Sequence, residues 1–483
     1  MESISNFYFI IDNIYYKIAN IFSENKLKKI SFVGAFLLAL QFILNNMSFL
    51  WLFTEGIEVL NKLEGFIWEF TFSIFFVLMF SSLFKNKRKK REVQLKNINL
   101  WIVLPLTIFS VFWTLSSFTA GFGRLKLTLI IIFLFNPVIL RSNNLNEIKN
   151  IINRFIYSNM ILGFVYYLLS IIWMPYSGIR YHALSFNPAA VAVLSLNFII
   201  CAMYLIFITD KLLVKLYSYI IFGVSIGMIL LTETRTIVVV LAVLLISNYI
   251  YIFMVKGKSQ IIKELIAAIS VIFITIMFLL FMNKVNSIDT YRNKLDIKDN
   301  FYYKTITHLN KRQVPLFYKS NKKKNEKTDL TNIFGRFIIE EKEIEEKDYF
   351  NNVLSGRSKI WKDYASRIKL LGQRELDRDY KREHKIPVHA HNIYLQISYD
   401  GGLIAGISIL FLSIYLLIKS LKICISKTES DFGYLLGITS ISYVIRGIVE
   451  ASYSPLYYNI GSILLLAIIP FIIKDNKKVI NYK

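Results

Sequence analysis

Long runs of apolar residues, separated by polar segments, limit this chain to an all-α membrane architecture. A helix needs roughly 20 mostly apolar residues to cross a hydrocarbon layer about 30 Å thick, because its backbone must satisfy its own hydrogen bonds there. About twelve stretches meet this requirement. They lie at residues 30–52, 66–84, 99–118, 126–141, 156–174, 187–209, 214–231, 236–254, 265–282, 402–418, 432–449 and 459–473. We therefore predict a polytopic membrane protein with about 12 transmembrane helices and no large soluble core.

The basic residues predict the orientation of these helices. The net charge is +24, and much of it falls in short segments between apolar runs, such as KLKK (26–29), KNKRKKR (85–91) and KDNKK (474–478). Short cytoplasmic loops are enriched in Lys and Arg, so both termini are expected in the cytoplasm. This distribution favours a lipid bilayer as the partner and argues against a nucleic-acid-binding surface.

The resulting organisation has five parts. The N-terminal segment has apolar residues at helical spacing, which favours an amphipathic helix in the cytoplasmic interface, with a disordered tail as the alternative. A long polar segment between the ninth and tenth apolar runs is placed outside, because long translocated loops escape the charge rule. The five parts are residues 1–29 (amphipathic segment), 30–282 (helices 1–9), 283–391 (long extracytoplasmic loop), 392–473 (helices 10–12) and 474–483 (basic tail).

Within the long outer segment, SGRSKIWKDYASRIKLL (355–371) predicts a short amphipathic helix. Trp361, Tyr364, Ile368 and Leu371 recur at helical spacing, and Ser355 precedes them as a candidate N-cap. Two placements remain open: the outer membrane interface, or a small extracytoplasmic subdomain.

Rare charged groups converge on the outer side of the predicted membrane. Arg180, Arg235, Arg357 and Arg446 all fall in outer segments or at the outer ends of apolar runs. The guanidinium group binds phosphate oxygens through paired donors and stays charged at any working pH, so several of them near a bilayer surface suit a lipid-linked diphosphate. The alternative for each arginine is snorkelling to lipid headgroups, and it is weakest for Arg235, which lies in a tight turn.

His389 and His391 occupy the mouth of the tenth apolar run, in a chain with only five histidines. Histidine is the side chain best suited to accept a proton near neutral pH, which makes His391 a candidate base. Two alternatives are a metal site that adds His384, and an ordinary helix start capped by Asn392. The two cysteines, Cys201 and Cys424, indicate neither a disulfide framework nor a metal site.

At this point the sequence resembles a known family. HNIYLQISYDGGLIAG (391–406) resembles the signature of the O-antigen ligase and O-antigen polymerase superfamily, in which a histidine precedes a glycine-rich helix start. RYHALSFNPAAVA (180–192), TETRT (232–236) and SGRSKIW (355–361) resemble three further elements of that family, in the same order. Ala183 and Ala189 stand where the family usually has glycine and asparagine.

The resemblance implies a GT-C-like, all-helical glycosyltransferase of the bacterial plasma (inner) membrane. The donor would be a glycan on undecaprenyl diphosphate, and the acceptor either lipid A core or another lipid-linked repeat. The reaction would use no metal or other cofactor and would take place on the extracytoplasmic face. The implied roles are base for His391, diphosphate binding for Arg235 and Arg180, and substrate positioning for Arg357, Asn392 and Arg446.

Two other classes stay open. A lipid-linked oligosaccharide flippase or transporter also has about twelve helices, but such proteins place polar groups near the bilayer midplane and carry internal repeats. The apolar runs hold few ionisable residues, Glu69 among them, and no clear repeat. A non-catalytic scaffold or sensor is the third class.

Overall fold

Helices make up nearly all of the part of the chain that the structure, a computed structural model, describes. That part comprises residues 13, 15–17, 19–46, 71–72, 74–84, 99–120, 145–173, 181, 183–185, 188–287, 357–372, 389–426, 430–450 and 460–472. It contains no strand, so the all-α prediction is confirmed within these residues.

The helices follow the apolar runs of the sequence. In chain order they are α2 (Glu24–Asn46), η1 (Ser81–Phe84), α5 (Leu100–Ala120), α8 (Leu145–Trp173), α9 (Pro188–Ile208), α10 (Leu212–Leu231), α11 (Arg235–Lys256), α12 (Lys258–Ser287), α18 (Arg357–Ser366), α20 (Ile393–Gly401), α21 (Leu403–Ile425), α22 (Asp431–Val449), α23 (Ile460–Ile468) and η5 (Ile469–Phe471).

Eight helices within the described residues are long and apolar enough to cross a membrane, namely α2, α8, α9, α10, α11, α12, α21 and α22. Three further predicted runs are present as the shorter apolar helices Ile74–Phe84, Leu100–Ser116 and Ile460–Phe471. The run at 126–141 lies outside the described residues, as do about half of the N-terminal segment 1–29 and most of segment 283–391. The count of about 12 therefore stays a prediction, whereas the eight candidate spans support a polytopic membrane protein.

Burial separates a central helix from peripheral ones. In α9, 83% of the residues in its apolar window are buried, against 28% in α12. A helix that is apolar on all sides and enclosed by its neighbours is typical of a membrane-protein interior. The apolar residues exposed on α12, such as Ile269 and Phe273, form the kind of surface that lipid covers.

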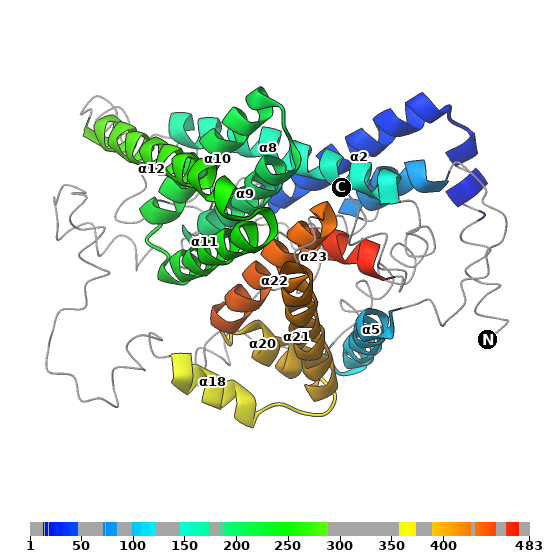
Figure 1. Ribbon diagram of the computed structural model, residues 1–483. Coiled ribbons are helices and arrows are strands. Elements are labelled where there is room, and N and C mark those ends of the chain that lie inside the picture. The colour runs from blue at the N-terminus through cyan, green and yellow to red at the C-terminus, as the bar shows by residue number, and fades with distance from the viewer. Residues whose placement is uncertain are drawn as a thin grey trace, which may run out of the picture.

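The bundle has two groups of helices. Helices α8 to α12 form one group, and α5 with α20 to α23 forms the other (Figure 1). In the first group the Tyr167 hydroxyl donates to Ser195 Oγ (3.0 Å) and lies 2.7 Å from Ser225 Oγ, joining α8, α9 and α10. In the second group Asn99 Nδ2, just before α5, donates to the Tyr415 hydroxyl of α21 (2.9 Å). These polar contacts fix which helix faces meet.

The antiparallel course of α11 and α22 connects the two groups. Near the start of α22, the Tyr434 hydroxyl donates to Asn248 Oδ1 in the second half of α11 (2.5 Å), and the Tyr434 ring also packs on Tyr251. From Tyr434 to Glu450 the chain rises roughly 24 Å, and from Asn248 back to Arg235 roughly 20 Å, at 1.5 Å per residue. The start of α11 and the end of α22 therefore lie at the same end of the bundle.

Lysines mark the other end of the bundle, which we call the basic end and define by Lys28, Lys149 and Lys256. Lys149 Nζ lies 2.5 Å from Asp431 Oδ2, so the starts of α8 and α22 meet there. Lys256, at the end of α11, lies over the Phe207 ring at 4.3 Å. The end defined by His391, Arg235 and Glu450 is called the histidine end.

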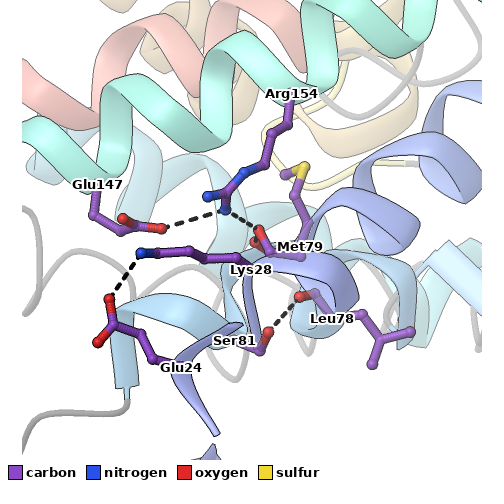
Figure 2. A network of polar contacts seen from close by, with 8 residues as sticks. Glu24, Lys28, Leu78, Met79, Ser81, Glu147 and Arg154 are labelled. Carbon is purple, nitrogen blue, oxygen red and sulfur yellow. Dashed lines mark hydrogen bonds and ion pairs between the residues drawn. The ribbon is translucent and has the colours of Figure 1, made fainter. Parts of the chain in front are cut away.

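A polar network at the basic end holds α2, the apolar helix Ile74–Phe84 and α8 together (Figure 2). Arg154 Nη1 donates to Ser31 Oγ (2.7 Å) and to Glu147 Oε1 (3.3 Å), and Ser31 Oγ donates to the Met79 carbonyl (2.6 Å). The Arg154 and Glu147 side chains are only 17% and 15% exposed. Because removing one partner of a buried ion pair leaves an uncompensated charge, this network constrains how α8 packs on α2.

Candidate active site at the histidine end

The first turn of α20 places His391. Asn392 is the N-cap of this helix, and its Oδ1 accepts hydrogen bonds from the backbone N–H groups of Tyr394 and Leu395 (both 3.0 Å). Its Nδ2 donates to the Ile448 carbonyl of α22 (3.1 Å). The helix start proposed as an alternative in the sequence is therefore confirmed, and Asn392 also ties α20 to the end of α22.

His391 precedes this cap, with its backbone in the left-handed region (φ 48°). It therefore lies before α20, which begins at Ile393, and not on a face of that helix. The left-handed turn directs the ring toward α22, where His391 Nδ1 lies 3.2 Å from Glu450 Oε1. The side chains are 37% and 19% exposed, so the pair is accessible from one side.

Glu450 terminates α22. Its backbone is extended, and its N–H donates to the Arg446 carbonyl (2.8 Å). Burial raises the pKa of its carboxyl group, but the hydrogen bond with His391 and the charges of His391, Arg357 and Arg446 outweigh it and hold the pKa below its ordinary value. Glu450 is therefore an anion surrounded by cationic partners.

Arg357 reaches the same carboxylate from α18. Its Nη1 donates to the Val449 carbonyl, and its Nη2 lies 3.9 Å from Glu450 Oε2. The guanidinium is 16% exposed. One arginine thus supplies a donor to the last carbonyl of α22 and a counter-charge to Glu450, which joins α18 to α22.

Small residues allow the elements around this site to approach closely. A Cβ atom at Gly447 would lie 2.6 Å from Ile393 Cγ2, so only glycine lets the first turn of α20 press on the last turn of α22. Gly402 has φ 94°, and a Cβ there would lie 2.3 Å from the Leu370 carbonyl oxygen. The backbone therefore approaches closely at Gly402, and this seats residues 370–372 beside the start of α21.

Arg446 lies one turn before Glu450 on α22. Its Nε atom is buried and makes no hydrogen bond within the described residues. A guanidinium with unused donors beside an apolar boundary is an anion site when a ligand reaches it. Glu450 is the described counter-charge acting on it.

Arg235 begins α11, directly after the three-residue connection from α10, as the predicted tight turn requires. Its side chain is exposed. The Tyr181 N–H donates to the Leu231 carbonyl at the end of α10 (3.0 Å), so the segment after Arg180 adjoins this turn. Arg180 itself lies outside the described residues.

Backbone conformation also distinguishes the histidine end. Ala183, Glu233 and His391 are the non-glycine residues with positive φ in the described part of the chain, at 50°, 50° and 48°. Each lies in one of the motifs that the sequence singled out at this end. Such conformations are costly for L-residues and cluster where a site needs a fixed geometry. The value at Ala183 also explains why glycine suits this position.

The structure brings His391, Asn392, Arg357 and Arg446 together and places Arg235 at the same end of the bundle. The sequence alone indicated no role for Glu450, although it is the residue that contacts both His391 and Arg357. A charged residue just after an apolar run was the available signal. Among the described residues, no group of three His, Cys, Asp or Glu side chains forms a candidate metal site, and His384 lies outside them.

Fold and site define a class: a polytopic helical membrane protein with a histidine–carboxylate pair and several arginines at one end of its bundle. Residues 220–410 match the family model described as O-antigen ligase. Over these residues the match confirms the resemblance to the O-antigen ligase and polymerase superfamily predicted from the sequence. The matched region includes Arg235, Arg357, His391 and Asn392 and ends before Arg446 and Glu450. Comparison with the curated proteins gave no match.

Proposed function

We propose that this protein transfers a glycan from undecaprenyl diphosphate to lipid A core or to another lipid-linked repeat, on the extracytoplasmic face of the bacterial inner membrane. In this reaction the acceptor hydroxyl oxygen forms a bond to the anomeric carbon of the donor sugar. The bond from that carbon to the diphosphate oxygen breaks, and the diphosphate leaves with the electron pair. The hydroxyl proton passes to His391 Nε2.

The contact between His391 Nδ1 and Glu450 carries this proposal. A carboxylate beside Nδ1 favours the tautomer with the proton on Nδ1, which leaves Nε2 as an acceptor. Nε2 has no hydrogen bond to a described residue, and the ring is partly exposed. This is the arrangement that a general base for a sugar hydroxyl requires, and such bases contribute typically about 10²–10⁴-fold.

The arginines supply the second requirement, stabilisation of the departing diphosphate. Arg235 is exposed at the start of α11, and the Nε of Arg446 is unused, so both suit a phosphate ligand. Arg180 keeps the diphosphate role that the family resemblance implies. Asn392 and Arg357 contact the protein itself, which supports a part in positioning the site.

The orientation follows from charge. The basic end holds Lys28, Lys149 and Lys256, and cytoplasmic ends of helices are enriched in such residues. The histidine end would then face away from the cytoplasm, where lipid-linked glycans meet their acceptors.

The test is complementation of a deletion strain, with surface polysaccharide analysed by gel and donor lipid by mass spectrometry. His391→Ala should accumulate in the membrane like the wild type yet leave almost no transferred glycan and build up donor lipid on the outer leaflet. Full surface glycan with this variant would disprove the base assignment. Donor accumulating on the inner leaflet of the deletion strain would instead indicate a flippase.

The same strain separates the two transferase reactions. Loss of all attached glycan, with long chains intact on the carrier lipid, indicates a ligase. Single repeats attached to the core indicate a polymerase. Arg235→Lys keeps the charge but loses the forked donor geometry, so donor binding should weaken. Unimpaired binding by this variant would remove Arg235 from the diphosphate site.

A further inference from the structure

We propose that Glu450 is a positioning residue that fixes the orientation and tautomer of His391, and that Arg357 acts through Glu450 instead of on the substrate. This inference rests on the proposed function of His391 as the base. It gives a part in the chemistry to Glu450, which lies outside the region matched by the family model. It also changes the role that the family resemblance implied for Arg357.

Each carboxylate oxygen of Glu450 has a partner. Glu450 Oε1 faces His391 Nδ1 (3.2 Å), and Oε2 faces Arg357 Nη2 (3.9 Å). Arg357 Nη1 donates to the Val449 carbonyl, so the guanidinium contacts both the backbone of Val449 and the side chain of Glu450. With its carboxylate placed between His391 and Arg357, Glu450 cannot turn away without breaking both contacts.

Three helices converge to bring His391, Glu450 and Arg357 together. Asn392 and Gly447 bring the start of α20 against the end of α22, and Arg357 brings α18 to the same point. The α18 helix is itself seated on α20, because the Tyr364 and Tyr399 rings lie edge to face at 5.1 Å. The site thus depends on packing between segments far apart in the sequence. A residue that only capped one helix would not require this packing.

Charged and polar groups surround the pair. They are Glu450, Arg446 and Tyr443 from α22, Arg357 from α18 and Tyr394 from α20. Glu450 is the one described carboxylate among them. Replacing it by glutamine removes the carboxylate that faces His391 Nδ1 and keeps the size of the side chain.

The experiment compares Glu450→Gln, Glu450→Asp and Arg357→Lys. Detergent-solubilised protein is added to membranes of the deletion strain, which hold the accumulated donor and the acceptor, and transfer is followed from pH 5 to 9, a range of about four units around neutrality. Glu450→Gln should lose roughly 10²-fold in rate with donor affinity unchanged, since a misdirected base forfeits most of its contribution. Glu450→Asp keeps the charge and should recover part of the rate.

Arg357→Lys tests whether Arg357 acts through Glu450. Lysine keeps one charge but cannot serve the Val449 carbonyl and the carboxylate together, so transfer should fall roughly 10-fold with donor affinity unchanged. Asp363→Asn is the matched control. It removes the exposed pair of Asp363 with Arg367 (3.2 Å) on the same helix and should leave rate and pH profile as in the wild type.

Each outcome decides. A wild-type rate with Glu450→Gln overturns the inference. A lower rate that Glu450→Asp does not recover in part also overturns it, because it indicates a structural effect alone. If Glu450→Gln does not accumulate as folded protein, Glu450→Asp and Arg357→Lys are judged by the same rate and donor-affinity measurements. Weakened donor binding by Arg357→Lys would return Arg357 to the substrate. A fully active His391→Ala would instead refute the proposed function itself.

Discussion

Replacing Asn392 by alanine should open the first turn of α20 and release His391. The substitution removes two kinds of contact: the cap to the N–H groups of Tyr394 and Leu395, and the bond from Nδ2 to the Ile448 carbonyl. An N-cap contributes about 1 kcal/mol, and a hydrogen bond of this kind about 1 kcal/mol net. The first turn should therefore be destabilised by about 2 kcal/mol, a factor of about 30 in its opening equilibrium.

Hydrogen exchange measures this opening directly. In Asn392→Ala, peptides covering residues 393–397 should exchange about 30-fold faster, and transfer should fall only by the fraction of molecules in which the turn is open. Asn392→Ser is the matched control, because serine caps helices as well as asparagine but lacks the donor to Ile448. It should exchange only about 5-fold faster, the factor for about 1 kcal/mol.

Two results would refute this reasoning. Unchanged exchange at 393–397 in Asn392→Ala would mean that other contacts hold the turn. Equal effects of alanine and serine would mean that the cap contributes nothing. A large loss of transfer without faster exchange would instead return Asn392 to direct contact with the substrate.

Three further predictions concern the same end of the bundle. Gly447→Ala should separate α20 from α22, because the added Cβ would lie 2.6 Å from Ile393 Cγ2. This variant should lower transfer by roughly 10-fold or more in the complementation strain. Gly437→Ala is the control and should leave transfer unchanged, because a Cβ there meets nothing within 4 Å. The pKa of Glu450 is lowered in the folded protein, so the stability that its carboxylate contributes is present above the pKa of the unfolded chain, near 4.5. That stability is lost as the pH falls below this value. The midpoint of thermal unfolding should therefore fall less between pH 5 and 3 in Glu450→Gln than in the wild type. Ala183→Gly should cost less than about 0.5 kcal/mol in thermal unfolding, because relief of a positive φ offsets the entropy of glycine; a cost of about 1 kcal/mol, as expected within a helix, would contradict the strain.

Periodicity and hydropathy predicted most of the fold. The helical elements at 188–208, 235–256 and 431–449 follow their apolar runs within a few residues, because burial in lipid or in the bundle is what those runs require. The end of α18 was harder to predict: the spacing through Ile368 and Leu371 suggested a longer helix, but the chain leaves the helix at Ser366 so that residues 370–372 can pack beside Gly402. That end depends on a tertiary contact, which local spacing does not report.

The candidate site was predictable as a set of residues but not as a set of contacts. Glu450 lies far from His391 and Arg357 in the sequence, and only the packing of α20 and α18 on α22 makes them neighbours. For the same reason the sequence left Asn392 divided between a cap and a substrate contact. The left-handed backbone at His391, which turns the ring off the helix face, also depends on these tertiary contacts.

The bond from Arg357 to the last carbonyl of α22 has a consequence for how such a chain can diversify. The bond fixes the first residue of α18 to the end of α22, beside Glu450 and His391. Sequence changes before Arg357 that keep this bond should therefore leave the histidine–carboxylate pair in place. Exchange of the segment before Arg357 between related chains should then preserve the arrangement of His391 and Glu450.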